Sequence, residues 1–220
     1  MNKPNISVYG ILDAGVTPDA DFVTMALAAV KGGATLLQLR AKEAGDGWVL
    51  ETARAIVHEL VGFEVPLLLN DRVELVAATG AQGAHIGQDD MPAREARRWL
   101  GHHRILGLSI GSEADAETAP VAEIDYACIG GVFATPSKDK PGAPIGIAGW
   151  QRCAAILRAR RPDLLVGAIA GIGPANAADV IAAGADGIAV ISAMFAQPDV
   201  TKATAELAAI VANARAGRAQ

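Results

Sequence analysis

Two aspartates that follow short apolar runs have the side chains and the spacing best suited to chemistry. Asp71 follows the run Pro66–Leu69 and one Asn, and Asp90 lies shortly after the run Gly83–Ile86. If both runs are neighbouring parallel strands, their carboxyl ends lie at the same edge of a sheet and the two carboxylates converge. Mg²⁺ prefers a few carboxylates together with water and substrate phosphate oxygens. The pair therefore predicts a magnesium site.

Helix capping is the competing interpretation of these acidic positions. Asn and Asp are common helix N-caps and turn residues, so either site alone is more often a cap than a metal ligand. Asn70 precedes Asp71, and Asp89 precedes Asp90. Spacing alone does not choose between Asp89 and Asp90. The two sites together, beside cationic residues, favour the metal interpretation.

The cationic residues close the second strand-like run. Gln38, Arg40 and Lys42 alternate with apolar residues, so they share one face of a strand. In a closed barrel an inward face of this kind would bring two cations to the mouth. Solvation at a strand end is the alternative for each residue taken alone, and their common face favours a functional role.

Three later segments have the composition of phosphate-binding loops. The longest loop-like segment, Thr135–Pro144, carries hydroxyl groups and two lysines, which suits a lid that holds phosphate oxygens. An exposed connection is the alternative. Gly171–Pro174 and Ile191–Ala193 follow the last two strand-like runs, where glycine permits close backbone approach and a helix start offers free N–H groups. Any tight turn can also use Gly or Ser.

His85 lies within a strand-like run, where we expect it to serve packing or a local hydrogen bond. No histidine has a Ser or Cys partner that can be identified from the local sequence. The sequence therefore gives no support for a nucleophilic triad.

The elements that must position these residues alternate along the whole chain. The strand candidates are Ile6–Leu12, Thr35–Leu39, Pro66–Leu69, Gly83–Ile86, Ile105–Leu108, Tyr126–Ile129, Leu164–Ile169 and Gly187–Ile191. The helix candidates are a first segment with Phe22, Met25, Ala26 and Ala29 at helical spacing, and then Trp48–Leu60, Arg72–Ala78, Ala93–Leu100, Ser112–Ala119, Ala148–Ala159, Ala175–Ala183 and Thr201–Ala214.

An eightfold alternation of strand and helix predicts an α/β protein of the (β/α)8 TIM-barrel class. Its ligand site would lie in the loops after the strands, at their C-terminal ends. The 220 residues contain no low-complexity stretch or polar linker, so one domain spanning 1–220 is expected. A doubly wound open sheet is the second candidate. It is disfavoured because no GxGxxG follows the first strand.

Composition limits the partners and the compartment. A formal charge of −5 argues against nonspecific binding to nucleic acid or to an anionic membrane. Cys128 and Cys153 have neither CxxC spacing nor nearby His partners, so a disulfide framework or zinc site is not expected. The N-terminus lacks a signal-like apolar region, and no later run is long and apolar enough to span a membrane. We expect a cytoplasmic protein. The sequence leaves open a homo-oligomer.

The ordered set of motifs is more specific than any one of them. It resembles the thiamine-phosphate synthase family over nearly the whole chain, in order and approximate spacing. The motifs are Gln38-Leu39-Arg40-Ala41-Lys42, Asn70-Asp71-Arg72, His85-Ile86-Gly87-Gln88-Asp89-Asp90, Gly107-Leu108-Ser109, Thr135-Pro136-Ser137-Lys138, and Gly171-Ile172 with Ile191-Ser192.

The resemblance implies a transferase with two small phosphorylated heterocyclic substrates. The reaction would couple 4-amino-2-methyl-5-(diphosphooxymethyl)pyrimidine to 4-methyl-5-(2-phosphooxyethyl)thiazole, giving thiamine phosphate and diphosphate. Mg²⁺ would be the cofactor, with Asp71 and Asp90 as its ligands. Arg40 and Lys138 would stabilise the leaving diphosphate. The pyrimidine diphosphate would contact Gln38, Arg40, Lys42, Asn70, Ser109 and Lys138, and the thiazole phosphate would contact Thr135, Ser137, Gly171, Ile191 and Ser192.

Two positions depart from the family pattern. The family usually has an acidic residue where this chain has Ala41, and Gly-Gly where it has Ala170-Gly171. Ala41 lies on the opposite strand face from Arg40 and Lys42, so we expect it to affect support of the site more than ligand contact. Ala170 adds a methyl group beside the phosphate turn. That methyl bears on affinity for the thiazole phosphate, and on substrate identity, more than on the fold.

Two other functions are compatible with a phosphate-binding barrel. The related thiazole tautomerases share the barrel and the phosphate turns, and a noncatalytic barrel could sense or carry a thiamine precursor. Asp71, Asp90 and Lys138 argue against the tautomerase, since an isomerase has no evident use for all three. Binding of one precursor without product would favour the noncatalytic barrel.

Overall fold

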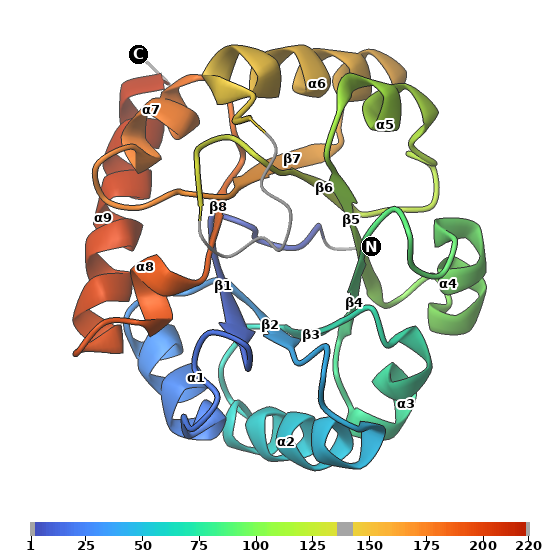
Figure 1. Ribbon diagram of the computed structural model, residues 1–220, viewed down its shortest axis with the longest axis vertical. Helices are drawn as coiled ribbons and strands as arrows, with labels where there is room; N and C mark the ends of the chain where they lie inside the picture. The colour runs from blue at the N-terminus through green and yellow to red at the C-terminus, as the bar shows by residue number, and fades with distance from the viewer. Residues whose placement is uncertain (1–2, 136–142, 219–220) are drawn as a thin grey trace.

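Eight parallel strands form a closed barrel in chain order, with β8 pairing back to β1 (Figure 1). The computed structural model describes residues 3–135 and 143–218. Chain order and parallel pairing throughout are the topology that the alternating pattern predicted. The strands are β1 (Val8–Asp13), β2 (Leu36–Arg40), β3 (Leu67–Asn70), β4 (Gly83–Ile86), β5 (Ile105–Ile110), β6 (Tyr126–Ile129), β7 (Leu165–Ile169) and β8 (Ile188–Val190).

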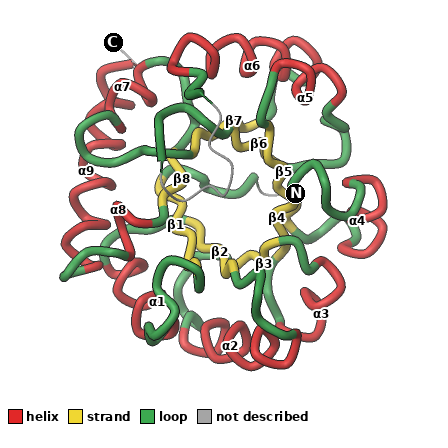
Figure 2. Tube along the Cα trace, in the orientation of Figure 1, coloured by secondary structure: helices red, strands yellow, loops and turns green. Residues whose placement is uncertain are grey.

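Helices form a ring outside the strands (Figure 2). They cover the outer faces of the strands, whose inner faces point to the barrel axis. The helices are α1 (Phe22–Lys31), α2 (Asp46–Glu59), the 3₁₀ helix η1 (Val73–Leu75), α3 (Val76–Thr79), α4 (Ala93–Leu100), α5 (Glu113–Thr118), α6 (Gly146–Arg160), α7 (Ala177–Ala182), α8 (Ser192–Phe195) and α9 (Val200–Arg218).

The alternation of side chains along each strand divides the core in two. On β2, Leu37 and Leu39 pack outward against the helices, while Leu36 packs inside the barrel with Tyr9 and Tyr126. Burying a Leu or Ile side chain in either layer contributes about 1.5–3 kcal/mol. The inner layer closes the barrel interior below the loops, so ligands can enter from the loop side.

Two helical segments differ from the sequence expectation. The segment expected as one helix over Arg72–Ala78 begins later, as η1 followed by α3, because tight turns precede it. The amide of Arg72 donates to Asn70 O and the amide of Val73 to Asp71 O, at 2.7 and 2.9 Å. The four-residue α8 directly after β8 was not predicted, because a single turn has no readable periodicity.

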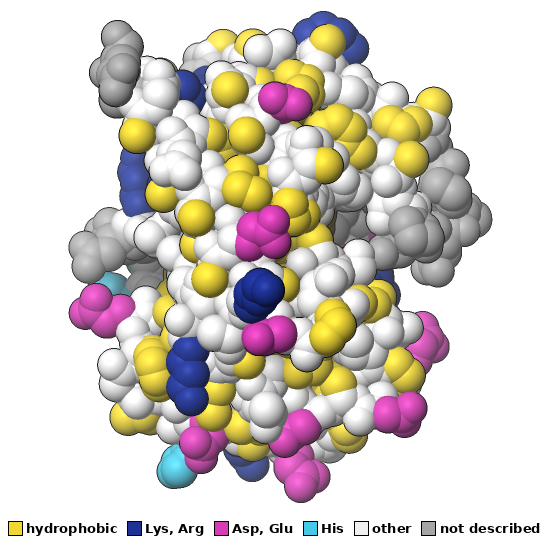
Figure 3. All heavy atoms as spheres, turned by 90° about the vertical axis from the view of Figure 1, so that its left-hand side faces the viewer, with side chains coloured by type: hydrophobic (Ala, Val, Ile, Leu, Met, Phe, Trp, Pro, Cys, Tyr) yellow, Lys and Arg dark blue, Asp and Glu magenta, His cyan; other side chains and the backbone are white. Residues whose placement is uncertain are grey.

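The outer surface mixes charges of both signs. Figure 3 shows the face around α1, α8 and α9, where Lys, Arg, Asp and Glu side chains are dispersed among hydrophobic and neutral atoms. Within the described residues, no helix is both long and apolar enough to cross a membrane.

Candidate active site

A cavity of about 800 Å³ lies at the C-terminal ends of the strands. This volume is within the range of small-molecule sites. The cavity brings together the predicted site residues that the structure describes, which are Gln38, Arg40, Lys42, Asn70, Asp71, Asp90, Ser109, Thr135, Gly171, Ile191 and Ser192. The predicted residues Ser137 and Lys138, and most of the predicted lid Thr135–Pro144, lie outside the described residues.

Asp71 and Asp90 line this cavity as a pair of interacting carboxylates. Asp71 has a left-handed backbone with φ of 61°, and its amide donates to His85 O at 2.9 Å, which ties the end of β3 to β4. Asp90 is held by the amide of Gly87, which donates to Oδ2 at 2.6 Å. Burial, followed by interaction with Asp90, raises the pKa of Asp71 from 3.8 to about 6. Asp71 interacts with the carboxylate of Asp90. Asp89 also lines the cavity, but it does not contribute to the pKa shift of Asp71.

These carboxylates fit a Mg²⁺ ion. Burial and the neighbouring Asp90 both disfavour the charged form of Asp71, and a bound divalent cation would offset both effects. Among residues 3–135 and 143–218, no three His, Cys, Asp or Glu side chains gather to form a closed metal cage. Two carboxylates with open space around them suit Mg²⁺, which keeps waters and takes substrate phosphate oxygens as further ligands.

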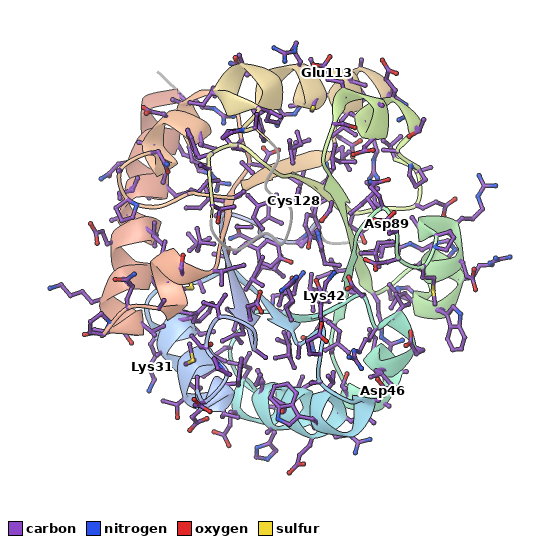
Figure 4. The ribbon with its side chains drawn as sticks, in the orientation of Figure 1. Lys31, Lys42, Asp46, Asp89, Glu113 and Cys128 are labelled. Atoms are coloured by element: carbon purple, nitrogen blue, oxygen red, sulfur yellow. The ribbon has the colours of Figure 1, made fainter. Side chains whose placement is uncertain are left out.

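Two cations line the same cavity, and each pairs with a carboxylate. Lys42 Nζ is 3.6 Å from Asp71 Oδ2, and Arg40 Nη1 donates to Asp13 Oδ2 at 2.5 Å. Figure 4 shows Lys42 inside the ring of strands in projection, whereas the labelled Lys31 and Asp46 come from outer helices. Buried Asp13 at the end of β1 was missed by sequence reasoning. Its position after an apolar strand, like that of Asp71, was the available signal.

Arg72 supports the loop that carries Lys42. Its guanidinium pairs with Asp46 and donates from Nη2 to Ala41 O at 3.2 Å and to Lys42 O at 3.3 Å. The Ala41 side chain packs in the outer core and does not line the cavity, so it lies on the supporting face. Sequence reasoning assigned no role to Arg72, although it belongs to the motif Asn70-Asp71-Arg72. Its reach back to the preceding βα loop is a tertiary contact.

A buried chain of polar side chains forms the floor of the cavity. Gln38 Nε2 donates to Tyr9 Oη at 2.6 Å, and the hydroxyls of Tyr9 and Tyr126 are 3.1 Å apart. His85 Nδ1 lies 2.8 Å from Tyr126 Oη, and its Nε2 lies 2.9 Å from Ser109 Oγ. Burial raises the pKa of both tyrosines well above 10 and lowers the pKa of His85 to about 4. All three rings are therefore neutral near pH 7.

The loops after β7 and β8 form the opposite side of the cavity. Gly171 has φ of 66°, and a Cβ there would lie 2.4 Å from Ala134 O, so glycine is required for the close approach of the loop after β7 to the loop after β6. Ala170 before it has φ of 88°, which L side chains rarely adopt. Ser192 begins α8, the kind of short extra helix that accompanies phosphate sites in this barrel class.

Comparison with known proteins identifies the family of this chain. The family described as thiamine monophosphate synthase matches residues 8–194. A thiamine-phosphate synthase of Agrobacterium fabrum is 47% identical over 206 residues, 94% of each chain. One of Azorhizobium caulinodans is 40% identical and covers 96% of this chain and 97% of its own.

A solved structure of a related enzyme also superposes on this chain. The thiamine phosphate pyrophosphorylase of Pyrococcus furiosus superposes with a TM-score of 0.83 at 32% identity, covering 96% of this chain and 98% of that one. This chain belongs to the thiamine monophosphate synthase family.

Proposed function

We propose that this chain couples 4-amino-2-methyl-5-(diphosphooxymethyl)pyrimidine to 4-methyl-5-(2-phosphooxyethyl)thiazole, with Mg²⁺ as cofactor, giving thiamine phosphate and diphosphate. The observation that carries the proposal is one cavity with two anion-binding sides. One side has the carboxylate pair and two cations, and the other has the turns after β7 and β8. Two phosphorylated substrates need two such sides.

The first side would hold the pyrimidine diphosphate. Asp71 and Asp90 would hold Mg²⁺, and Arg40, Lys42 and Lys138 would contact the diphosphate oxygens. Gln38, Asn70 and Ser109 would contact the same substrate. The Arg40–Asp13 ion pair supports this assignment, because it fixes a guanidinium at the strand end before the ligand arrives.

The second side would hold the thiazole phosphate through Thr135, Ser137, Gly171, Ile191 and Ser192. Loops seven and eight are the recurrent phosphate position of TIM barrels. The close approach at Gly171 and the short helix at Ser192 support the assignment. The Ala170 methyl group lies in this turn, so it bears on affinity for the thiazole phosphate.

The reaction needs no enzyme nucleophile, which fits a site whose buried hydroxyls and imidazole are neutral. The bond from the exocyclic carbon of the pyrimidine to the diphosphate oxygen breaks, and its electron pair leaves with diphosphate. The lone pair of the thiazole nitrogen then forms the new carbon–nitrogen bond. Bound Mg²⁺ would supply positive charge to the diphosphate oxygens. Arg40 and Lys138 would stabilise the same charge, and losing one such contact costs about 2.7–4 kcal/mol in comparable oxyanion sites.

The proposed setting is a cytoplasmic enzyme of one barrel domain over 1–220, without a nucleic-acid or membrane partner. The net charge of −5 supports this choice of partners. Self-association into a homo-oligomer is compatible with the proposal, because every residue assigned to the site comes from one chain.

The test supplies both precursors with Mg²⁺ and measures thiamine phosphate and diphosphate. Equal amounts of both products, abolished by excess chelator, are expected. Isomerisation of a thiazole without diphosphate release would instead support a tautomerase. Binding of one precursor without any product would support the noncatalytic barrel. Product formation unchanged in chelator would overturn the magnesium assignment.

A further inference from the structure

Asn176 occupies the N-cap position of α7 but does not cap the helix. An asparagine at this position usually accepts a hydrogen bond from the second or third amide of its helix. The Asn176 side chain turns back instead, into the turn that joins β7 to α7 (Figure 1). Departures from a local preference of this kind are expected at strained or functional positions, and Asn176 lines the cavity.

Two hydrogen bonds join the Asn176 amide to this turn. Nδ2 donates to Gly171 O at 2.9 Å, and Oδ1 accepts from Gly173 N at 2.9 Å. The orientation of the amide is fixed, because a backbone carbonyl can only accept and a backbone N–H can only donate. Turning the amide over would place two acceptors together and two donors together. The side chain is therefore locked across residues 171–173.

The backbone of this turn is left-handed at two successive residues. Ala170 has φ of 88° and Gly171 has φ of 66°. Sparsely populated backbone conformations persist only where the surrounding contacts hold them. A second contact comes from the loop after β6, where Phe133 N donates to Ala170 O at 3.1 Å. The Asn176 side chain and this loop together fix two successive peptide planes.

Fixing the two carbonyls also fixes the N–H groups of the same peptides, because the two groups of a planar trans peptide point in opposite directions. Phe133 holds the carbonyl of Ala170, so the N–H of Gly171 points away from Phe133. Asn176 holds the carbonyl of Gly171, so the N–H of Ile172 points away from Asn176. Within the part of the chain that the structure describes, neither N–H has an acceptor. Gly171 and Ile172 both line the cavity.

Two successive N–H groups without acceptors in a turn form a concavity that suits an anion. The turn also lies against the start of α8, since a Cβ at Gly173 would be 3.7 Å from the Cβ of Ala193. Ala193 follows Ser192, which we assign to the thiazole phosphate. The two N–H groups therefore belong to the side of the cavity that would hold this phosphate.

We propose that Asn176 is a positioning residue for the thiazole phosphate. Its amide holds the turn after β7 in the shape that presents the N–H groups of Gly171 and Ile172 to phosphate oxygens. Asn176 acts through these two N–H groups. The inference rests on the proposed function, because it takes the thiazole phosphate as the anion.

The experiment measures KM for each substrate in wild type and Asn176→Ser. Serine is as good an N-cap as asparagine but is too short to bridge the turn, so this variant removes the lock and spares the helix. KM for the thiazole phosphate should rise about tenfold or more, since the hydrogen bonds to a charged phosphate lose their alignment. KM for the pyrimidine diphosphate should stay within about twofold, because distant sites couple weakly. Equal increases in both values, or no increase for the thiazole phosphate, would overturn the inference.

Asn176→Asp separates the two bonds of the lock. Aspartate keeps an oxygen for Gly173 N and remains a good N-cap, so this variant should melt no lower than wild type. It has no donor for Gly171 O, and its charge repels a phosphate. KM for the thiazole phosphate should therefore rise at least as much as in Asn176→Ser. A wild-type KM in this variant would refute the role of the donor.

Asp21→Ala is the matched control for helix capping. Asp21 is the N-cap of α1, where its carboxylate accepts from the amides of Val23 and Thr24 at 3.1 Å, and it does not line the cavity. Its loss should lower the melting temperature and leave both KM values unchanged. A KM for the thiazole phosphate raised as much as in Asn176→Ser would attribute the effect to lost stability and overturn the inference.

A binding measurement separates this inference from the proposed function. If wild type forms no thiamine phosphate, the proposed function fails, and amide NMR with inorganic phosphate as the probe still tests the turn. Phosphate should shift the backbone N–H signals of Gly171 and Ile172 in wild type, and about tenfold more phosphate should be needed in Asn176→Ser. No shift of either signal in wild type, or the same concentration dependence in both proteins, would overturn the inference.

Discussion

The carboxyl group of Asp71 has different proton affinities in the folded and unfolded chain. Its pKa is about 6 in the folded protein, against an ordinary value of 3.8, because of burial and the nearby Asp90. A raised carboxyl pKa means that the folded state binds the proton more tightly. The stability that this group contributes is present below about pH 4 and is lost as the pH rises through about 6. Near neutral pH the metal-free protein therefore carries a destabilising charge at this position.

We predict that Asp71→Asn stabilises the metal-free protein at about pH 7.5, by about 1–2 kcal/mol after allowance for solvent screening. Asn tolerates the left-handed backbone of this position, so the turn should persist. Urea denaturation in chelator at about pH 7.5 and about pH 4 measures the effect, which should vanish at the lower pH. Destabilisation at the higher pH would contradict the account.

At the scale of elements, the turn after β7 contains the clearest backbone strain. Ala170 has φ of 88°, and a left-handed backbone costs an L residue about 1–2 kcal/mol. Glycine removes this cost but adds about 0.5–1 kcal/mol of conformational entropy. We therefore predict that Ala170→Gly raises the free energy of unfolding by about 0.5–1 kcal/mol, as measured by urea denaturation.

Ala168→Gly is the matched control for this turn. Ala168 lies in β7, two residues before Ala170, is fully buried and lacks a positive φ. Glycine there removes a packed methyl group and increases the conformational entropy of the unfolded chain, so this variant should be destabilised. If both variants lost stability to the same extent, the strain at Ala170 would be refuted.

Element types could be predicted from sequence because they depend on local periodicity, whereas some boundaries could not. The eight strands coincide with short apolar runs, each of which can be recognised from the local sequence alone. The start of the helical segment after β3 depends instead on the turn made by Asn70 and Asp71. The single turn of α8 at Ser192 is stabilised by its place beside α9 and β1, which no local pattern reveals.

At the scale of the whole molecule, barrel closure creates contacts that link distant parts of the chain. Strand ends share one edge in a parallel barrel, so the meeting of Asp71 and Asp90 could be predicted from their positions after strands. The buried hydrogen bond between Tyr126 and Tyr9 could not, because these residues are 117 positions apart and meet only across the barrel interior. The same holds for Asp13, whose contact with Arg40 requires β1 to pair with β2.

The central claim is that Asp71 and Asp90 form the metal half of a diphosphate site. The most direct test is the Mg²⁺ dependence of thiamine phosphate formation in wild type, Asp90→Asn and Asp89→Asn, each checked for folding by its melting curve. Asp90→Asn should lower turnover by about 10²–10³-fold and need more Mg²⁺. Asp89→Asn, which also removes a carboxylate from the cavity wall, should retain turnover within about threefold. Wild-type turnover and Mg²⁺ dependence in folded Asp90→Asn, or equal losses in both variants, would contradict the account.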